Sequence, residues 1–272
     1  MQKHFRTIEV SDPRFEREYL RHVTVKSAAL HARADITIFV SPGVEAGQNP
    51  PIVILLHGVY GSHWAWTLKG GVHRTALRLV EEGSIAPLIL AMPSDGLWGD
   101  GSGYLPHSGQ DFERWIVAEV PGAVAAVLGQ TTPGSALFIA GLSMGGFAAL
   151  RLGAKYPILF RGVSGHSSIT HFDQMGQFVE EDLNLYDILE EDGSLLQALL
   201  KNRDKLPPLR FDCGIDDPLI EHNRELHRRL ETEGVPHVYQ EFPGSHEWPY
   251  WEEHIVDTLR FFHQIGGGPS AV

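Results

Sequence analysis

Apolar residues recur along this chain in short runs of about five, separated by stretches in which they return every three or four positions. Runs that are apolar almost throughout predict strands covered on both faces of a sheet. They occupy residues 52–56, 86–91, 136–140, 159–163 and 209–213. Three further segments alternate between apolar and polar residues and predict half-exposed strands, at 23–27, 36–40 and 238–242. The first two of these are expected to pair antiparallel.

The stretches between these strands carry the helical period. They predict helices at about 64–82, 112–128, 144–156, 218–233 and 249–264. The pair Pro121-Gly122 is expected to kink or divide the second helix. Strands that alternate with helices indicate right-handed crossovers and a mostly parallel sheet of about eight strands, flanked by helices. Chemistry on such an α/β sheet collects in the loops beyond the carboxyl ends of the strands.

The chain of 272 residues fits one α/β domain over residues 1–272, because no Pro/Gly/Ser-rich linker divides it. Residues 169–207 interrupt the alternation of strands and helices. They carry the acidic runs 180–182 and 190–192 with scattered apolar residues between them. Two interpretations stay open for this segment: a solvated helical excursion, or a small cap insertion over the site.

Composition narrows the class of protein. The net charge of −12 argues against nucleic acid and anionic membranes as partners. No apolar run reaches the length of about 20 residues that spans a bilayer, and the first ten residues lack the apolar core of a secretory signal. The single cysteine, Cys213, lies in an apolar run and is expected to be a buried, unreactive thiol. A cytoplasmic location is therefore expected, while the oligomeric state stays open, a homo-oligomer included.

The hexapeptide Gly141–Gly146, Gly-Leu-Ser-Met-Gly-Gly, follows one apolar run and precedes a predicted helix. In the pattern G-x-S-x-G, a strand ends, the backbone turns sharply at the serine, and a helix begins behind it. Such a turn exposes Ser143 as a nucleophile, with the helix N-terminus beside a developing oxyanion. The alternative is a serine that only caps the helix.

A serine nucleophile needs a base, and the base needs a carboxylate to orient it. His246 follows the last predicted strand, and the acids Asp212, Asp216 and Asp217 follow the strand before it. The order serine, acid, histidine is that of the α/β-hydrolases. Asp217 is the preferred acid because Gly214-Ile-Asp-Asp-Pro-Leu219 matches the hydrolase pattern G-x-x-D-x-L, in which the acid is the fourth residue. Asp216 is the second choice. The competing roles are a helix N-cap for the acid and an exposed loop histidine for His246.

The oxyanion hole needs a second backbone N–H group besides that of Met144. The strand at 52–56 ends in His57-Gly-Val-Tyr-Gly61, so Val59 is the expected donor and Tyr60 the second choice. His57 is expected to brace this loop. The remaining histidines show no metal-ligand spacing, so no metal and no cofactor are expected.

These motifs resemble the putative-esterase (esterase D-like) family of α/β-hydrolases, which includes tributyrin-type, feruloyl and acetylxylan esterases and S-formylglutathione hydrolases. The resemblance spans about residues 50–265. It implies a metal-free serine esterase with Ser143, Asp217 and His246 as its catalytic triad. The chain reads Val59-Tyr-Gly-Ser-His63 where the formylglutathione hydrolases have a cysteine, which disfavours that substrate. The matching segments are 55–58, 92–96, 141–146, 214–219 and 244–251.

Tryptophans gather in or beside the loops predicted at this end of the sheet, namely Trp64, Trp66, Trp98, Trp248 and Trp251. At least two are expected to line the pocket, with Trp64, Trp98 and Trp248 as candidate substrate contacts for aromatic or sugar groups. The alternative is that several of them only pack helices on the sheet. We expect a serine carboxylesterase that hydrolyses small-molecule esters, either short-chain or sugar- or aromatic-linked, through an acyl-enzyme on Ser143. The alternatives are an acyltransferase or thioesterase of the same fold, or a non-catalytic binding protein.

Overall fold

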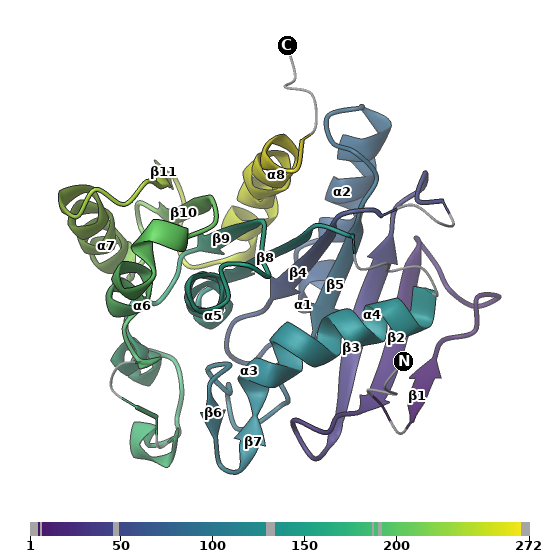
Figure 1. Ribbon diagram of the computed structural model, residues 1–272, viewed down its shortest axis with the longest axis horizontal. Helices are drawn as coiled ribbons and strands as arrows, with labels where there is room; N and C mark the ends of the chain where they lie inside the picture. The colour runs from purple at the N-terminus through teal and green to yellow at the C-terminus, as the bar shows by residue number, and fades with distance from the viewer. Residues whose placement is uncertain are drawn as a thin grey trace.

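A computed structural model describes residues 5, 7–45, 49–128, 134–186, 188–189 and 192–267. Its main feature is a sheet of nine strands that fans across the molecule from β1 to β11 (Figure 1). Strands β1, β2, β3 and β5 pair antiparallel, and the strands from β5 to β11 run parallel. In spatial order, the strands are β1 Ile8–Val10, β2 Leu20–Lys26, β3 Arg33–Val40, β5 Ile89–Pro93, β4 Ile52–Leu56, β8 Leu137–Leu142, β9 Gly162–His166, β10 Leu209–Gly214 and β11 Val238–Phe242.

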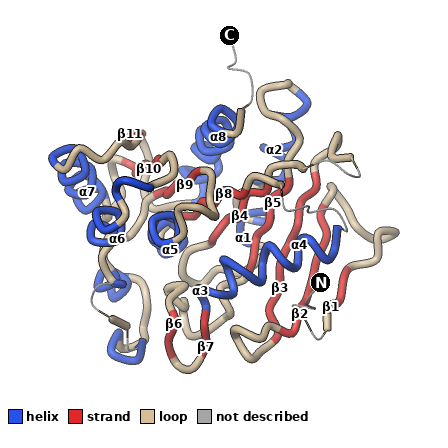
Figure 2. The backbone as a smooth tube through the Cα atoms, in the orientation of Figure 1, coloured by secondary structure: helices blue, strands red, loops and turns tan. Residues whose placement is uncertain are grey.

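Helices cover both faces of this sheet (Figure 2). One face packs against α1 Ala65–Leu68, α2 Val72–Glu81 and α8 Trp248–Ile265. The other packs against α3 Phe112–Arg114, α4 Val120–Leu128, α5 Met144–Lys155, α6 Leu195–Lys201 and α7 Ile220–Thr232. A small hairpin of β6 Pro106–His107 and β7 Gln110–Asp111 lies beside α3. This arrangement confirms the expected α/β-hydrolase fold.

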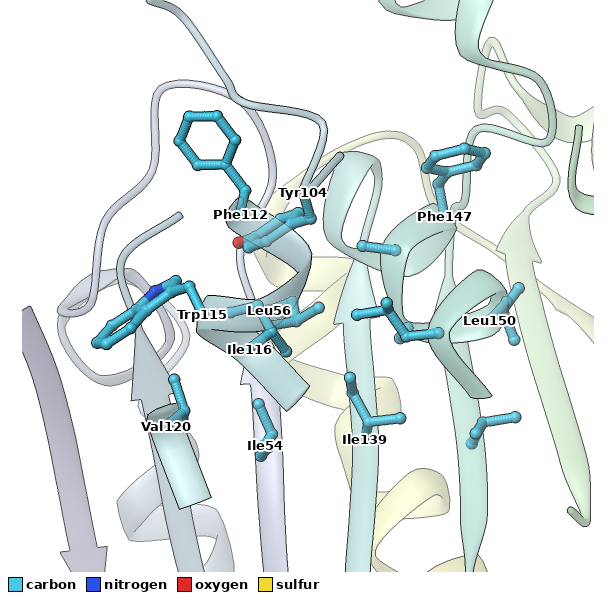
Figure 3. Close-up of a cluster of buried hydrophobic side chains, with 14 of the residues drawn as sticks. Ile54, Leu56, Tyr104, Phe112, Trp115, Ile116, Val120, Ile139, Phe147 and Leu150 are labelled. Atoms are coloured by element: carbon cyan, nitrogen blue, oxygen red, sulfur yellow. The ribbon is translucent and has the colours of Figure 1, made fainter. Parts of the chain in front are cut away.

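Strand β4 shows why the central strands are apolar throughout. Ile54 and Leu56 point into the core under α4 and α5, while Val53 and Leu55 point into the core under α8. Figure 3 shows the first of these cores, where Leu56 lies beside Ile116 and Ile54 lies between Val120 and Ile139. A strand buried on both faces has no position for a polar side chain, because successive residues face opposite helix layers.

The prediction of a strand at 159–163 was wrong by three residues. The chain turns after Pro157, Ile158 is almost fully exposed, and the strand is β9, Gly162–His166. Its glycines are required by close packing: a Cβ at Gly162 would lie 2.2 Å from Ile265 of α8, and one at Gly165 would lie 2.8 Å from Leu150 of α5. The strand is therefore built from small residues that give no strong apolar signal.

Two predicted helices are divided. The segment 64–82 forms α1 and α2, separated at Gly70-Gly71, where Gly71 adopts a φ of 55° and a Cβ on Gly70 would meet the Trp248 ring at 2.8 Å. The segment 112–128 forms α3 and α4 with a π-helical turn, Trp115–Glu119, directly before the predicted break at Pro121. The strand predicted at 86–91 begins later, at Ile89, after Pro87. Strand β1 and the β6–β7 hairpin were not predicted.

Candidate active site

Ser143 occupies the turn between β8 and α5, with φ 54° and ψ −119°. This conformation is costly for any residue with a Cβ, so neighbouring contacts must hold it. The amide of Ser143 donates a hydrogen bond to the carbonyl of His166 at the end of β9, at 2.9 Å. The flanking glycines allow the close approach: a Cβ on Gly141 would lie 2.3 Å from the Gly145 carbonyl oxygen, and one on Gly145 would lie 2.5 Å from two carbonyl oxygens of β4 and its loop.

The structure brings three predicted side chains together. Nε2 of His246 lies 3.0 Å from Oγ of Ser143, and Nδ1 of His246 lies 2.9 Å from Oδ2 of Asp217. The side chain of Asp217 is fully buried, that of His246 is 16% exposed, and Ser143 is 2% exposed. The other carboxylate oxygen of Asp217 accepts the amide of Leu219 at 2.8 Å. Asp217 therefore has both oxygens engaged and orients the imidazole toward the serine.

The competing acids have other contacts. The backbone of Asp216 pairs with the histidine loop: its amide donates to the carbonyl of Gly244, and its carbonyl accepts the hydroxyl of Ser245. The carboxylate of Asp212 is fully buried and accepts hydrogen bonds from Arg210 at 2.5 Å and from the Tyr250 hydroxyl at 2.9 Å.

Asp212 also pairs with His166, with Nδ1 and Oδ2 2.9 Å apart. Burial by itself would raise the pKa of the Asp212 carboxyl, but His166 and Arg210 outweigh burial and lower that pKa to about 2. This network joins β9, β10 and α8. The loop of Asp217 follows β10 directly, and the loop of His246 leads into α8.

Two amides near Ser143 are free to receive an oxyanion. Within the described part of the chain, neither the amide of Val59 nor that of Met144 donates a hydrogen bond. Gly58 places Val59 beside the serine, because a Cβ on Gly58 would lie 3.3 Å from that of Ser143. The second-choice donor, Tyr60, does not fit this role, since its amide already donates to the carbonyl of Asp100 at 2.7 Å.

His57 is buried and braces the loop of residues 57–61, which carries Val59 and which we call the oxyanion loop. Its Nδ1 lies 2.7 Å from the carbonyl of Gly58, and its Nε2 accepts the amide of Asp95 at 3.1 Å. The Asp95 carboxylate in turn accepts the amides of Leu97 and Ser102. The loops after β4 and β5 are thereby held together beside Ser143. Asp95 belongs to the matching segment 92–96, but its role depends on contacts between two loops that no sequence pattern records.

The tryptophans divide into packed and exposed residues. Trp66 and Trp251 are buried and donate to the Leu56 carbonyl and the Ser167 hydroxyl, respectively. Trp248 packs edge-on against both, with ring centroids 5.7 and 5.4 Å away. Trp98 is half-buried against Tyr186 and His107. Trp64 alone among the candidate contacts is exposed, at 38%.

The segment 169–207, interpreted as either a solvated excursion or a cap, contains short helical turns, Phe172–Gln177 and Leu183–Tyr186, followed by α6. Residues 187, 190 and 191 of this segment lie outside the described residues. Helix α6 packs on α5. Residues 170–186, which we call the strap, instead contact the site: Phe178 stacks on His246, and Glu181 accepts the amide of Asp100 at 2.9 Å. No sequence motif singled out these strap residues.

The described residues contain no group of three or more His, Cys, Asp or Glu side chains arranged to hold a metal ion. Cys213 is buried, and burial raises the pKa of its thiol. None of the helices in the described ranges is both long enough and apolar enough to cross a membrane.

Comparisons with known proteins agree with this geometry. The model of the family described as "Putative esterase" matches residues 27–262. An acetyl esterase from Caldicellulosiruptor saccharolyticus is 28% identical over 80% of this chain and 85% of its own length. Among solved structures, a ferulic acid esterase is 24% identical, with a TM-score of 0.80 over 96% of this chain and 99% of that one. An S-formylglutathione hydrolase from Staphylococcus aureus is 18% identical, with a TM-score of 0.71 over 93% of this chain and 98% of that one.

Proposed function

The chain belongs to the putative esterase family and is a carboxylic ester hydrolase, and we propose that it works through an acyl-enzyme formed on Ser143. The observation that carries this proposal is the hydrogen-bonded series from Asp217 through His246 to Ser143, with distances of 2.9 and 3.0 Å. A base within such reach of the hydroxyl proton meets the geometric requirement for general base catalysis. The buried carboxylate holds the imidazole in the tautomer that can accept this proton.

In the first half of the reaction, Oγ of Ser143 attacks the ester carbonyl carbon, and its proton passes to Nε2 of His246. The carbonyl oxygen becomes an oxyanion, which accepts hydrogen bonds from the amides of Val59 and Met144. The intermediate then collapses, the bond to the alcohol oxygen breaks, and His246 returns the proton to the departing alcohol. The acyl group is left as an ester of Ser143.

In the second half, His246 takes a proton from water, and the hydroxide oxygen attacks the acyl carbon. The same two amides hold the second oxyanion. Its collapse breaks the bond to Oγ of Ser143, which regains the proton from His246 and releases the carboxylic acid. The net reaction is ester plus water to acid plus alcohol.

For the substrate, we propose esters with a short-chain or aromatic acyl group, or with a sugar as the alcohol. The acetyl esterase and ferulic acid esterase relatives support acyl groups of these two sizes. Exposed apolar side chains follow three strands at the serine end of the sheet and can stack on a ring: Tyr60 at 63%, Trp64 at 38%, Leu97 at 60% and Ile215 at 46% exposure.

We place the enzyme in the cytoplasm, because its one cysteine cannot form an internal disulfide and is buried. Fractionation of the source cells with an antibody tests this location. Recovery of the protein in the medium would contradict it.

A fluorophosphonate probe and a panel of esters test the proposed reaction. The probe should label the wild-type protein once, at Ser143, and should label neither Ser143→Ala nor His246→Ala at a comparable rate. The panel comprises p-nitrophenyl acetate, butyrate and octanoate, methyl ferulate and an acetylated xylo-oligosaccharide. Cleavage by the wild-type protein but not by Ser143→Ala supports the proposal. A folded wild-type protein that is not labelled and cleaves no ester would refute it, and a new ester formed in added alcohol would identify acyl transfer.

A further inference from the structure

The imidazole of His246 lies between two aromatic rings. The ring of Phe178 stacks on its face, with centroids 5.1 Å apart and planes inclined by 22°. The indole of Trp251 meets it edge-on, with centroids 5.1 Å apart and planes at 89°. Trp251 belongs to α8, which follows the His246 loop directly, whereas Phe178 comes from the strap. The ring of Phe178 is therefore supplied by a part of the chain that is distant in sequence from His246.

The strap is tied at its base. His171 and Ser194 form a β-bridge, the amide of Phe172 donates to the carbonyl of Gly193, and that of Leu195 donates to the carbonyl of Thr170. These bonds close a long excursion into a loop whose two ends lie together. Met175, three positions before Phe178, is fully buried, and its carbonyl accepts a hydrogen bond from the amide of Phe178 at 2.8 Å.

The strap is also tied to the oxyanion side of the site. Asp100 accepts the amide of Glu180 on its carboxylate at 2.8 Å and donates its own amide to the carboxylate of Glu181. The same Asp100 accepts the amide of Tyr60, next to Val59. The hydroxyl of Tyr186 donates to the carbonyl of Gly101 at 2.7 Å. Phe178 is thus held between two anchored ends, one at the strap base and one at the oxyanion loop.

We propose that Phe178 is a positioning residue that acts through His246. This inference rests on the proposed function, since it concerns the base of that reaction. A ring stacked on the imidazole limits its rotation out of the line between Asp217 and Ser143, and it keeps water from that face. The imidazole becomes a cation when it takes the serine proton, and the face of an aromatic ring attracts a cation.

An aliphatic side chain of similar bulk can fill the space but cannot supply the flat, electron-rich face. Phe178→Leu should therefore lower kcat by roughly three- to tenfold, the size of an aromatic pair contribution expressed as a rate. The KM should stay within about twofold of the wild-type value, because the step affected is proton transfer and not substrate binding. Phe178→Tyr keeps the ring and should retain kcat within about twofold.

The matched control is Tyr239→Leu. Tyr239 stacks on His227 between β11 and α7, with centroids 4.6 Å apart and planes inclined by 27°. This variant loses an aromatic–histidine stack of the same kind that does not involve His246. Its kcat should equal that of the wild type, and its unfolding transition should show whether loss of a stack by itself destabilises the protein.

The experiment measures kcat and KM with p-nitrophenyl acetate, the unfolding transition, and the low-field proton NMR signal of the His246 Nδ1–H group bonded to Asp217. Faster exchange with water should broaden this signal in Phe178→Leu and not in Phe178→Tyr or Tyr239→Leu. An unchanged kcat and an unchanged signal in Phe178→Leu would overturn the inference, as would a change in KM alone or an equal loss in Tyr239→Leu. The NMR signal reads the position of the imidazole without turnover. If the wild-type protein were inactive, only the proposed function would fail, and the signal would still decide the role of Phe178.

Discussion

The strained turn at Ser143 predicts that glycine at this position gives a more stable protein than alanine does, although both substitutions abolish activity. Ser143 has φ 54° and ψ −119°, a region that glycine enters freely and that other residues enter at a cost. Ser143→Gly and Ser143→Ala both lose the hydroxyl group and its contact with His246. The two variants therefore differ chiefly in whether a Cβ remains in the strained conformation.

The size of the difference follows from two opposing terms. Removal of the Cβ relieves backbone strain of about 1–3 kcal/mol and so stabilises the folded state. Glycine also raises the conformational entropy of the unfolded chain, which lowers the stability of the folded state by about 0.4–1 kcal/mol. We expect Ser143→Gly to be more stable than Ser143→Ala by about 0.5–2 kcal/mol. For a domain of this size, that is a difference in Tm of roughly 1–5 °C. Neither variant can form an acyl-enzyme, so both should be inactive.

Differential scanning calorimetry and urea denaturation measure the two stabilities. Ser164 in the middle of β9 offers the matched control pair, because its φ is negative and both of its variants lose the hydrogen bond to Thr258. There the order should reverse, with Ser164→Ala above Ser164→Gly by about 0.5–1 kcal/mol. If Ser143→Ala proved as stable as Ser143→Gly or more so, the turn at Ser143 would not store strain of this size.

Three further predictions concern the acids and the tryptophans. Asp217→Asn should lower kcat by about four orders of magnitude, as in a comparable triad, because the imidazole of His246 loses its orienting acceptor; a steady-state loss below tenfold would contradict this role. The pKa of Asp212 in the folded protein, about 2, lies below the usual 3.8, so its contribution to stability is present above pH 4 and is lost as the pH falls through 2. Asp212→Asn should therefore lower the free energy of unfolding by roughly 3–5 kcal/mol at pH 7 and flatten its pH dependence between pH 4 and 2. An unchanged pH dependence would show that the ionisation of Asp212 does not contribute to it. Trp248→Ala should lower the stability of the protein by roughly 2 kcal/mol through lost packing. Trp64→Ala should change stability by no more than about 0.5 kcal/mol and should raise the KM for methyl ferulate by a larger factor than the KM for p-nitrophenyl acetate; an equal change in KM for both esters would remove Trp64 from the substrate contacts.

The sequence by itself determined the features that depend on short-range sterics and on residue order. The doubly covered strands could be read because a residue facing a helix layer must be apolar, and β11 was predicted at its observed bounds. The turn at Ser143 could be read because Gly141 and Gly145 leave room that any Cβ would fill. The order of serine, acid and histidine then selected a small set of candidate residues at one end of the sheet.

Only the tertiary structure decided among neighbours. Asp216 and Asp217 are adjacent, yet only Asp217 reaches His246, and Val59 rather than Tyr60 has a free amide because Asp100 binds the latter. Strand β9 was predicted three residues too early, because its small residues are required by the close packing of α5 and α8 and give no apolar signal. Phe178 reaches His246 across 68 positions of chain. Local patterns record the demands of a residue's own strand, turn or helix, whereas contacts between distant segments depend on how those elements pack, and this packing leaves no periodic trace in the sequence.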